Sequence, residues 1–204
     1  MTRVLALDLG TSSARGRLYD ERGRHVEGVE AQERYTGTRG HSGRLGEFDA
    51  DELVEVVRAA VAECRRDGAG PVDAVATSSF WHSLLALDSR GRPLTPVSTW
   101  RDTRAVNTAE ELARRLDGEA VHRRTGCPLH PSFWPARLLR LRLEEPDVFR
   151  EAARFVSFPD YALERLAGTL RTSLSTASAT GLLGLDGRWD EESFVQATTK
   201  PTRG

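Results

Sequence analysis

The sequence has 204 residues, enough for one large domain or two small ones. Hydrophobic residues make up 39% and charged residues 29%, which excludes a disordered chain, and two cysteines, Cys64 and Cys127, are too few for a disulfide scaffold. With 29 Lys and Arg against 30 Asp and Glu, the net charge of −1 gives no general attraction to nucleic acids or anionic membranes, and no apolar run approaches the ~18 residues of a membrane span.

Three strands joined by short turns are expected at the N-terminus. The apolar run 4–7 predicts a strand buried on both faces, and the polar segment 8–13 predicts a tight turn after it. Apolar or small residues alternate with larger polar ones over 14–19, which predicts a second strand with one buried face. Residues 20–24 have the composition of a hairpin turn, and a third strand is expected over 25–31.

A helix is expected to begin after Asp49. Asp49 can serve as its N-cap, and Glu52 completes a capping box three residues later. Apolar residues recur at helical spacing over 53–64, and the segment 67–71, which contains two glycines and a proline, ends the pattern.

The rest of the chain predicts two further strands and then mostly helices. Strands are expected over 72–77 and 83–87, and the turn composition of 88–93 repeats that of 20–24. Helical apolar spacing occurs in four segments, and short strands or turns follow in two more: 105–116, 135–143, 147–153 and 159–166, then 168–172 and 181–186. We therefore expect one α/β unit with a helical elaboration.

The segment from Asp8 to Arg15 carries the strongest chemical signal. It places a carboxylate, a glycine, three hydroxyl groups and a cation within eight residues of a buried strand. Such a turn can surround phosphates, with Asp8 holding a magnesium ion through water and Arg15 neutralising a phosphoryl oxygen. It is neither a Walker loop nor a Rossmann fingerprint. A plain hairpin, in which these residues only form the turn, is the alternative.

Two aromatic segments have the composition of a carbohydrate site. Residues 80–83 follow a strand, and their rings can flank a polyol while His82 bonds a hydroxyl; a buried aromatic cluster with a satisfied histidine is the alternative. Residues 100–104 combine a tryptophan, two arginines and a carboxylate, which suits vicinal hydroxyls. A helix N-terminus capped by Asp102 or Thr103 is the alternative for the second segment, and both interpretations can hold together. Residues 127–131 have the composition of a rigid structural loop.

Taken together, these segments resemble the N-terminal domain of the FGGY family of carbohydrate kinases. Within that family they resemble gluconokinases and xylulokinases more than glycerol kinases. The resemblance extends from about residue 3 to about residue 194, and the matching pieces are 7–15, the helix after 48–49, 75–82, 100–104, 125–128 and 175–183. It implies an α/β fold of the actin-like ATPase (ribonuclease-H-like) type, in which two domains enclose a cleft for ATP and Mg²⁺ and the sugar lies against the N-terminal domain.

The resemblance also implies roles for individual residues. Asp8 would belong to the magnesium site. The phosphate turn would consist of Gly10, Thr11, Ser12, Ser13 and Arg15. The sugar-facing wall would consist of Trp81, His82, Trp100 and Asp102. The usual Gln-Met-His-Gly of the family is replaced by residues 80–83, so the edge of the sugar pocket is expected to differ here.

The resemblance does not reach the end of a family member. Such proteins are more than twice as long, and their catalytic base is an Asp in a glycine-rich segment that does not occur before Gly204. We therefore expect residues 1–195 to be an N-terminal domain lacking its last core strand, residues 196–204 to be a divergent tail, and the C-terminal ATP-binding domain to be absent. The expected explanation is a truncated or frameshifted gene product, or a fragment.

Three functional hypotheses follow. The first is a kinase lineage that transfers a phosphoryl group from ATP to a hydroxyl of a gluconate- or xylulose-like sugar, with little turnover by this chain alone. The second is a non-catalytic sugar-binding or regulatory fragment, and the third is another actin-like protein that binds ATP but no sugar. A small sugar or sugar acid is the expected partner, a homodimer or a complementing C-terminal chain stays open, and the cytoplasm is the expected location.

Overall fold

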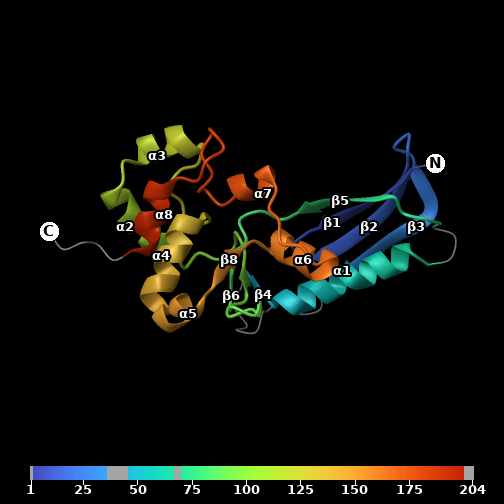
Figure 1. The fold of residues 1–204 in the computed structure, drawn as a ribbon, viewed down its shortest axis with the longest axis horizontal. Helices are drawn as coiled ribbons and strands as arrows, with labels where there is room; N and C mark the ends of the chain where they lie inside the picture. Colours follow the sequence, from blue (N-terminus) through green and yellow to red (C-terminus); the bar gives the residue numbers. More distant parts are fainter. Residues whose placement is uncertain (1, 36–45, 67–69, 200–204) are drawn as a thin grey trace.

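The computed structural model describes residues 2–35, 46–66 and 70–199, and it consists of a twisted sheet with its helices followed by a mostly helical body (Figure 1). The sheet lies at one end of the elongated molecule and helices α2 to α5 and α8 lie at the other. Short strands and helix α6 lie between these two parts. In the part of the chain that the structure describes, we find no helix with the length and apolar character of a membrane span.

The sheet contains four strands in the order β3-β2-β1-β5. Strand β1 (Arg3–Leu9) pairs with β2 (Ser13–Asp20) in antiparallel fashion, and β2 pairs in the same way with β3 (His25–Arg34). Strand β5 (Ala74–Ser79) lies parallel to β1. The three predicted N-terminal strands are therefore confirmed, and β5 begins and ends two residues later than expected.

Strand β1 is buried on one face only, which corrects the expectation of burial on both. Leu5, Leu7 and Leu9 are at most 5% exposed, whereas Ala6 on the opposite face is half-buried and Asp8 is exposed. Although the run 4–7 is continuously apolar, only alternate residues of the strand reach the core. The intervening positions 4 and 6 carry small or moderately sized side chains. The other face of the sheet is consequently open and available for binding.

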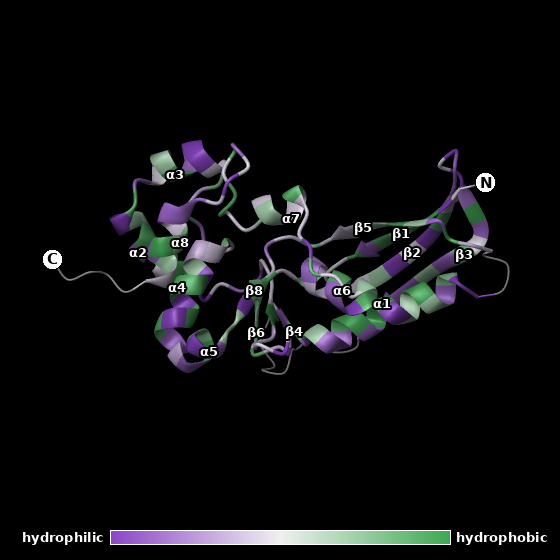
Figure 2. Cartoon of the chain, viewed as in Figure 1, coloured by the Kyte–Doolittle hydropathy of each residue, from purple (hydrophilic) through white to green (hydrophobic). Residues whose placement is uncertain are grey.

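Helix α1 (Ala50–Cys64) covers the buried face of the sheet. Asp49 caps it as predicted, because its carboxylate accepts hydrogen bonds from the backbone N–H of Asp51 and Glu52 at 3.0 and 2.9 Å. Hydrophobic and hydrophilic bands alternate along this helix, as expected for an amphipathic helix (Figure 2). Residues 67–69 of the expected terminating segment lie outside the described residues.

The two similar turn sequences adopt the same structure. In each, the first Asp donates its N–H to the carbonyl of an arginine four residues later, at 2.9 Å in both turns, and a glycine donates back to the Asp carbonyl at 3.0 Å. These glycines, Gly23 and Gly91, have φ values of +71° and +77°. The predicted similarity of the two turns is therefore confirmed, and it extends to their individual hydrogen bonds.

From residue 47 onward, the chain forms more elements than the sequence predicted. The helices are α2 (Val106–Arg115), α3 (Gly118–Thr125), α4 (Trp134–Glu144), α5 (Pro146–Glu151), α6 (Phe158–Ala167), α7 (Leu174–Ser178) and α8 (Glu191–Thr198), and the short strands are β4 (Glu47–Phe48), β6 (Leu85–Leu87), β7 (Val97–Ser98) and β8 (Arg154–Val156). Helices α3, α7 and α8 and strands β4, β7 and β8 were not expected. Strands β4, β7 and β8 have only two or three residues and exist through pairing with distant segments, β4 with β7 and β6 with β8.

The expected domain boundary at residue 195 falls inside helix α8. Ala197 is fully buried, and it joins Leu84, Leu138 and Leu182 in one apolar cluster. The chain is therefore part of the folded helical body as far as Thr198, although residues 200–204 of the expected tail lie outside the description.

Strand β5 forms an edge of the sheet among the described strands, and five of its six residues are exposed. Val75 is 57% exposed and borders an apolar hollow of about 610 Å³ between α1, α6 and the sheet. An exposed, partly apolar edge strand can pair with another chain.

We expect Val75→Lys to reduce self-association, because a charge on an edge strand disfavours pairing between edges. Sedimentation of the variant and the wild type over a range of concentrations measures the effect. Leu174→Lys is the matched control, since Leu174 is 77% exposed but lies on helix α7. Equal effects of the two substitutions would show that general surface polarity, and not the strand edge, controls association.

Candidate functional site

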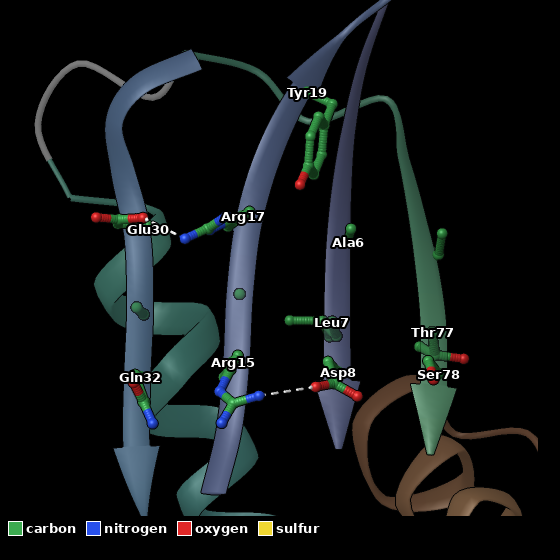
Figure 3. Close-up of a pocket in the computed structure, with 13 residues that line it drawn as sticks. Ala6, Leu7, Asp8, Arg15, Arg17, Tyr19, Glu30, Gln32, Thr77 and Ser78 are labelled. Carbon is green, nitrogen blue, oxygen red and sulfur yellow. Dashed lines mark hydrogen bonds and ion pairs between the residues drawn. The ribbon is translucent and has the colours of Figure 1, made fainter. Parts of the chain in front are cut away.

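Asp8 and Arg15 face each other at the end of the first hairpin. They are directly paired in the register of β1 and β2, and the Arg15 Nη1 lies 3.5 Å from the Asp8 Oδ2 (Figure 3). Both side chains remain about half exposed, at 51% for Asp8 and 54% for Arg15. The long separation and the exposure leave both charges available to a ligand.

These two residues line a hollow of about 610 Å³ on the open face of the sheet. All four strands contribute to it, with Thr77 and Ser78 on β5 beside Asp8 and the Arg17–Glu30 ion pair, at 3.2 Å, farther along the strands (Figure 3). Hydroxyl groups, a carboxylate and guanidinium groups are therefore combined on one concave surface, a donor set that suits a phosphorylated ligand with its metal.

The predicted phosphate turn is held by backbone hydrogen bonds. The N–H of Gly10 donates to the Ser13 carbonyl at 3.0 Å, and the N–H of Tyr35 donates to the Ser12 carbonyl at 3.2 Å. Ser12 is exposed and Thr11 half-buried, whereas Ser13 is only 3% exposed and its hydroxyl accepts a hydrogen bond from Gln32 at 3.4 Å. Thr11 and Ser12 are therefore the hydroxyl groups of this turn that a ligand can reach.

Tyr35 is a buried neighbour of this turn that the sequence did not single out. Burial, with a further contribution from the charge of Asp8, raises the pKa of Tyr35 to about 12, so its phenol stays neutral at physiological pH. Its ring contacts Phe48 at a centroid distance of 6.0 Å. Tyr35 thus connects the turn, through its N–H to the Ser12 carbonyl, with the core, through its ring contact with Phe48.

The residues around Asp8 fit a magnesium ion that keeps most of its water. The described part of the chain contains no group of three or more His, Cys, Asp or Glu side chains that could enclose a metal. Mg²⁺ does not need such a cage, because it is usually held by one or two carboxylates together with phosphate oxygens and water. Asp8, half exposed above the hollow, is a donor of this kind.

Trp81 and His82 follow directly from strand β5. The N–H of Phe80 donates to the Leu9 carbonyl at 3.0 Å, which brings this loop beside the end of β1. Trp81 is 52% exposed, and His82 has a left-handed backbone with φ of +57°, a conformation that is uncommon outside glycine. Because the Ala179 carbonyl can only accept, the His82 Nδ1 at 2.9 Å donates to it, which leaves Nε2 as the ring atom that a ligand can reach through a hydrogen bond.

Trp100 and Asp102 differ sharply in their surroundings. Trp100 is 54% exposed, and Arg101 lies 5.8 Å from the centre of its ring. Asp102 is only 6% exposed and accepts two hydrogen bonds from the Arg104 side chain, at 2.9 Å from Nε and 2.7 Å from Nη2, and a third from the Arg104 backbone N–H at 3.1 Å. Burial alone raises the pKa of Asp102, but the hydrogen bonds from Arg104 outweigh it and hold the pKa below its usual value. Asp102 is therefore a buried partner of Arg104 in this conformation.

Arg137 and Phe133 also border this region and were not recognised in the sequence. Phe133 packs edge-on against His82 at a centroid distance of 4.9 Å, and Arg137 is buried behind the loops. An arginine within the otherwise apolar run 134–139 was a usable signal, because arginine is almost never fully buried without a specific reason. Cys127 is half-buried, burial raises the pKa of its thiol, and it lies 3.8 Å from the Ser178 carbonyl, which fits a structural role.

Comparison with known proteins points to one family. The sequence model for the N-terminal domain of the FGGY family of carbohydrate kinases matches residues 3–201. The gluconokinase of Bacillus subtilis is 28% identical over 202 residues, and the xylulose kinase of Lactococcus lactis is 30% identical over 194 residues. The crystal structure of gluconate kinase from Lactobacillus acidophilus superposes with a TM-score of 0.87 at 28% identity.

These matches cover nearly all of this chain but less than half of each relative. They include 97% and 94% of this chain for the two sequences and 98% for the structure, against 38%, 38% and 40% of the relatives. The similarity is therefore to the N-terminal part of those proteins.

Proposed function

Because this chain belongs to the FGGY family of carbohydrate kinases and has the actin-like fold of their N-terminal domain, we propose that it forms the sugar-facing wall and the first phosphate turn of a sugar kinase. The proposed reaction is phosphoryl transfer from ATP to a hydroxyl of a sugar or sugar acid of the gluconate or xylulose type. The kinase class rests on the family, and the identity of the sugar rests on the relatives.

One observation carries the proposal: the phosphate turn and the sugar wall begin at neighbouring strand ends. Leu9 at the end of β1 is paired with Ser79 at the end of β5, and Trp81 and His82 follow immediately. Ligands of α/β sheets bind at the carboxyl ends of parallel strands. A sugar against Trp81 and His82 would thus lie beside a phosphate at Asp8 and Arg15, the proximity that phosphoryl transfer requires.

In this proposal each group has a limited task. Trp81 and Trp100 present ring faces to the apolar side of the sugar, and the His82 Nε2 accepts from a hydroxyl. Arg15 neutralises a phosphate oxygen, and Asp8 orients the metal through its water. When bound, MgATP supplies the phosphoryl group, and the metal offsets the negative charge that develops during transfer. The proposal places the general base in the family's C-terminal part, so this chain by itself binds with little turnover.

Asp8→Asn tests the magnesium assignment, because its effect on ATP affinity is expected to reverse when Mg²⁺ is removed. With Mg²⁺ present, we expect the variant to bind ATP about tenfold more weakly, equivalent to about 1.4 kcal/mol. With Mg²⁺ removed by EDTA, we expect it to bind ATP more tightly than the wild type, because the Asp8 carboxylate then repels the phosphates. Calorimetric titration under both conditions measures the two affinities.

Glu30→Gln is the matched control for this experiment. Glu30 is a half-exposed carboxylate on the same face of the sheet, but it is paired with Arg17 and lies away from the turn. We expect it to lack the magnesium-dependent reversal. Equal behaviour of the two variants would contradict the role of Asp8. Binding of gluconate or xylulose without any ATP binding would favour a non-catalytic sugar-binding module.

The proposal includes a cytoplasmic location, as for a metabolic kinase. It also includes two arrangements in which another polypeptide segment supplies the opposite wall of the cleft: a complementing C-terminal chain or a second copy in a homodimer. Robust phosphorylation of gluconate or xylulose by the purified chain alone would contradict the assignment of the base to the C-terminal part.

A further inference from the structure

Arg137 on helix α4 is the largest side chain in the interior of the described protein, and it is only 2% exposed. All five other residues of the segment 134–139 are apolar and partly or fully buried. Burying a guanidinium in such surroundings is costly unless its donors are satisfied. The position therefore calls for an account of what Arg137 binds.

The guanidinium group of Arg137 donates to the backbone of three separate loops. Its Nη1 donates to the His82 carbonyl, and Nη2 donates to the Thr99 carbonyl at 2.6 Å. Its Nε donates to the Pro131 carbonyl at 3.2 Å. A longer contact of 3.4 Å joins Nη1 to Ser98. One side chain thus connects segments that are up to 55 residues apart in the sequence.

Each of these loops carries a residue of the proposed sugar wall or borders it. His82 itself belongs to the wall, and Thr99 immediately precedes Trp100. Pro131 is two residues before Phe133, whose ring packs against His82. Apart from the 3.4 Å contact with the Ser98 hydroxyl, these contacts are to main-chain oxygens, so they fix the course of the backbone irrespective of the side chains that the loops present.

Within the described residues, no carboxylate lies within ion-pair distance of Arg137. Burial lowers the pKa of Arg137 to about 10, while the nearby charge of Asp102 opposes this shift. Arg137 therefore stays protonated at neutral pH with carbonyl oxygens as its partners. A buried apolar residue would avoid this desolvation, so stability alone is a poor reason for the arginine.

We propose that Arg137 is a positioning residue that holds the His82, Trp100 and Pro131 loops in the geometry that binds the sugar. This inference rests on the proposed function for its ligand, but the geometric part concerns the loops themselves. Arg137 contacts no ligand directly, because it is buried behind the wall. Its planar fork of donors suits three acceptors in different directions, which lysine, with donors on a single nitrogen, reproduces only in part.

The test uses the full chain labelled with 5-fluorotryptophan. We expect each of its four tryptophans to give its own ¹⁹F NMR signal. Signals are assigned by single Trp→Phe changes. We expect Arg137→Met to shift or broaden the signals of Trp81 and Trp100 and to leave that of Trp189 unchanged. We also expect Arg137→Met to weaken gluconate binding about tenfold, which a titration with gluconate measures. Arg137→Lys is expected to give smaller shifts and a loss of about threefold.

Arg142→Met is the control on the same helix. Arg142 donates to the Thr199 carbonyl at the other end of the helical body, and among the described residues it forms no hydrogen bond or ion pair with the three loops. We expect it to leave the Trp81 and Trp100 signals and gluconate affinity unchanged. A purely structural role for Arg137 would lower stability without moving these two signals in folded protein.

The outcomes separate the two proposals. Unchanged Trp81 and Trp100 signals in folded Arg137→Met, or in Arg137→Lys if the methionine variant does not fold, would overturn the positioning role. If those signals move as expected but neither gluconate nor xylulose binds the wild type, the loop-positioning part stands and the proposed sugar site fails. If sugar binds and Arg137→Lys weakens it more than Arg142→Met does, both are supported.

Discussion

Replacing Arg104 with methionine is expected to lower the free energy of unfolding by about 3–5 kcal/mol at neutral pH. Arg104 donates to both oxygens of Asp102 and also to Glu47, and these two carboxylates are only 5% and 4% exposed at their side chains. Removing the cation leaves their negative charges in a poorly solvated region. The loss is large because the penalty of the remaining buried charges is added to the loss of attraction.

The pH dependence gives this prediction a second, independent readout. In the wild type, hydrogen bonds from Arg104 hold the pKa of Asp102 below its ordinary value, so the associated stability is lost as pH falls through that lowered pKa. Without Arg104, burial raises the pKa of Asp102 instead, so the variant gains stability as pH falls through the raised value. The difference between the two proteins should therefore begin to shrink above the ordinary Asp pKa of about 4, as the variant gains stability, and shrink further below it, as the wild type loses stability.

Urea denaturation at a series of pH values measures the effect. Arg66→Met is the control, because Arg66 forms a 2.6 Å ion pair with Glu63 in which the arginine is 76% exposed, and such pairs contribute at most about 1 kcal/mol. Adding Asp102→Asn to Arg104→Met is expected to recover part of the loss. Equal losses for Arg104→Met and Arg66→Met would contradict the importance of the buried cluster.

Replacing Gly46 with alanine is expected to cost roughly 2–4 kcal/mol of unfolding free energy. Gly46 has φ of +88°, and a Cβ there would lie 2.9 Å from the backbone of Arg101 and Asp102. Main-chain atoms cannot rotate out of the way as a flexible side chain can. The Gly46 carbonyl also accepts hydrogen bonds from the N–H and Oγ1 of Thr99, so the displacement would reach the Trp100 loop.

Gly23→Ala separates the cost of the left-handed backbone from the cost of the clash between the new Cβ and the main chain. Gly23 has a similar φ of +71°, but a Cβ at this position meets no atom within 4 Å. It therefore reports only the cost of the left-handed backbone, about 1–2 kcal/mol. Denaturation of both variants gives the difference, which should be at least about 1 kcal/mol larger for Gly46. A difference near zero would mean that the Trp100 loop moves away at little cost.

The N-terminal half of the fold was predictable because its signals are local. Alternation defined the second strand, Asp49 defined the start of α1, and two matching turn sequences produced two matching turns. Strand β8 and helix α7 were missed because they have three and five residues, too few to show a period. Strand β8 depends on its pairing with β6, which lies about seventy residues earlier and cannot be inferred from local pattern.

The candidate site was predictable in part for the same reason. Asp8 and Arg15 are close in the sequence, and the hairpin that pairs them was expected. The burial of Asp102 under Arg104 was not, because it requires the distant Glu47 to complete the cluster. Arg137 was missed because its shortest contacts are to the main-chain oxygens of three loops, which leave no pattern of partner side chains in the sequence.

The hydrophobic residues of the chain are divided between separate interiors, with consequences for how it folds. One cluster joins the sheet to α1 and α6, and others lie among the helices, including Leu112, Val121 and Leu139 in one and Leu84, Leu138 and Ala197 in another. Parts with their own interiors can open at different free energies. We therefore expect the helical body and the sheet to open at different free energies, and we expect the contacts of Arg137 with the loops between them to couple the two events.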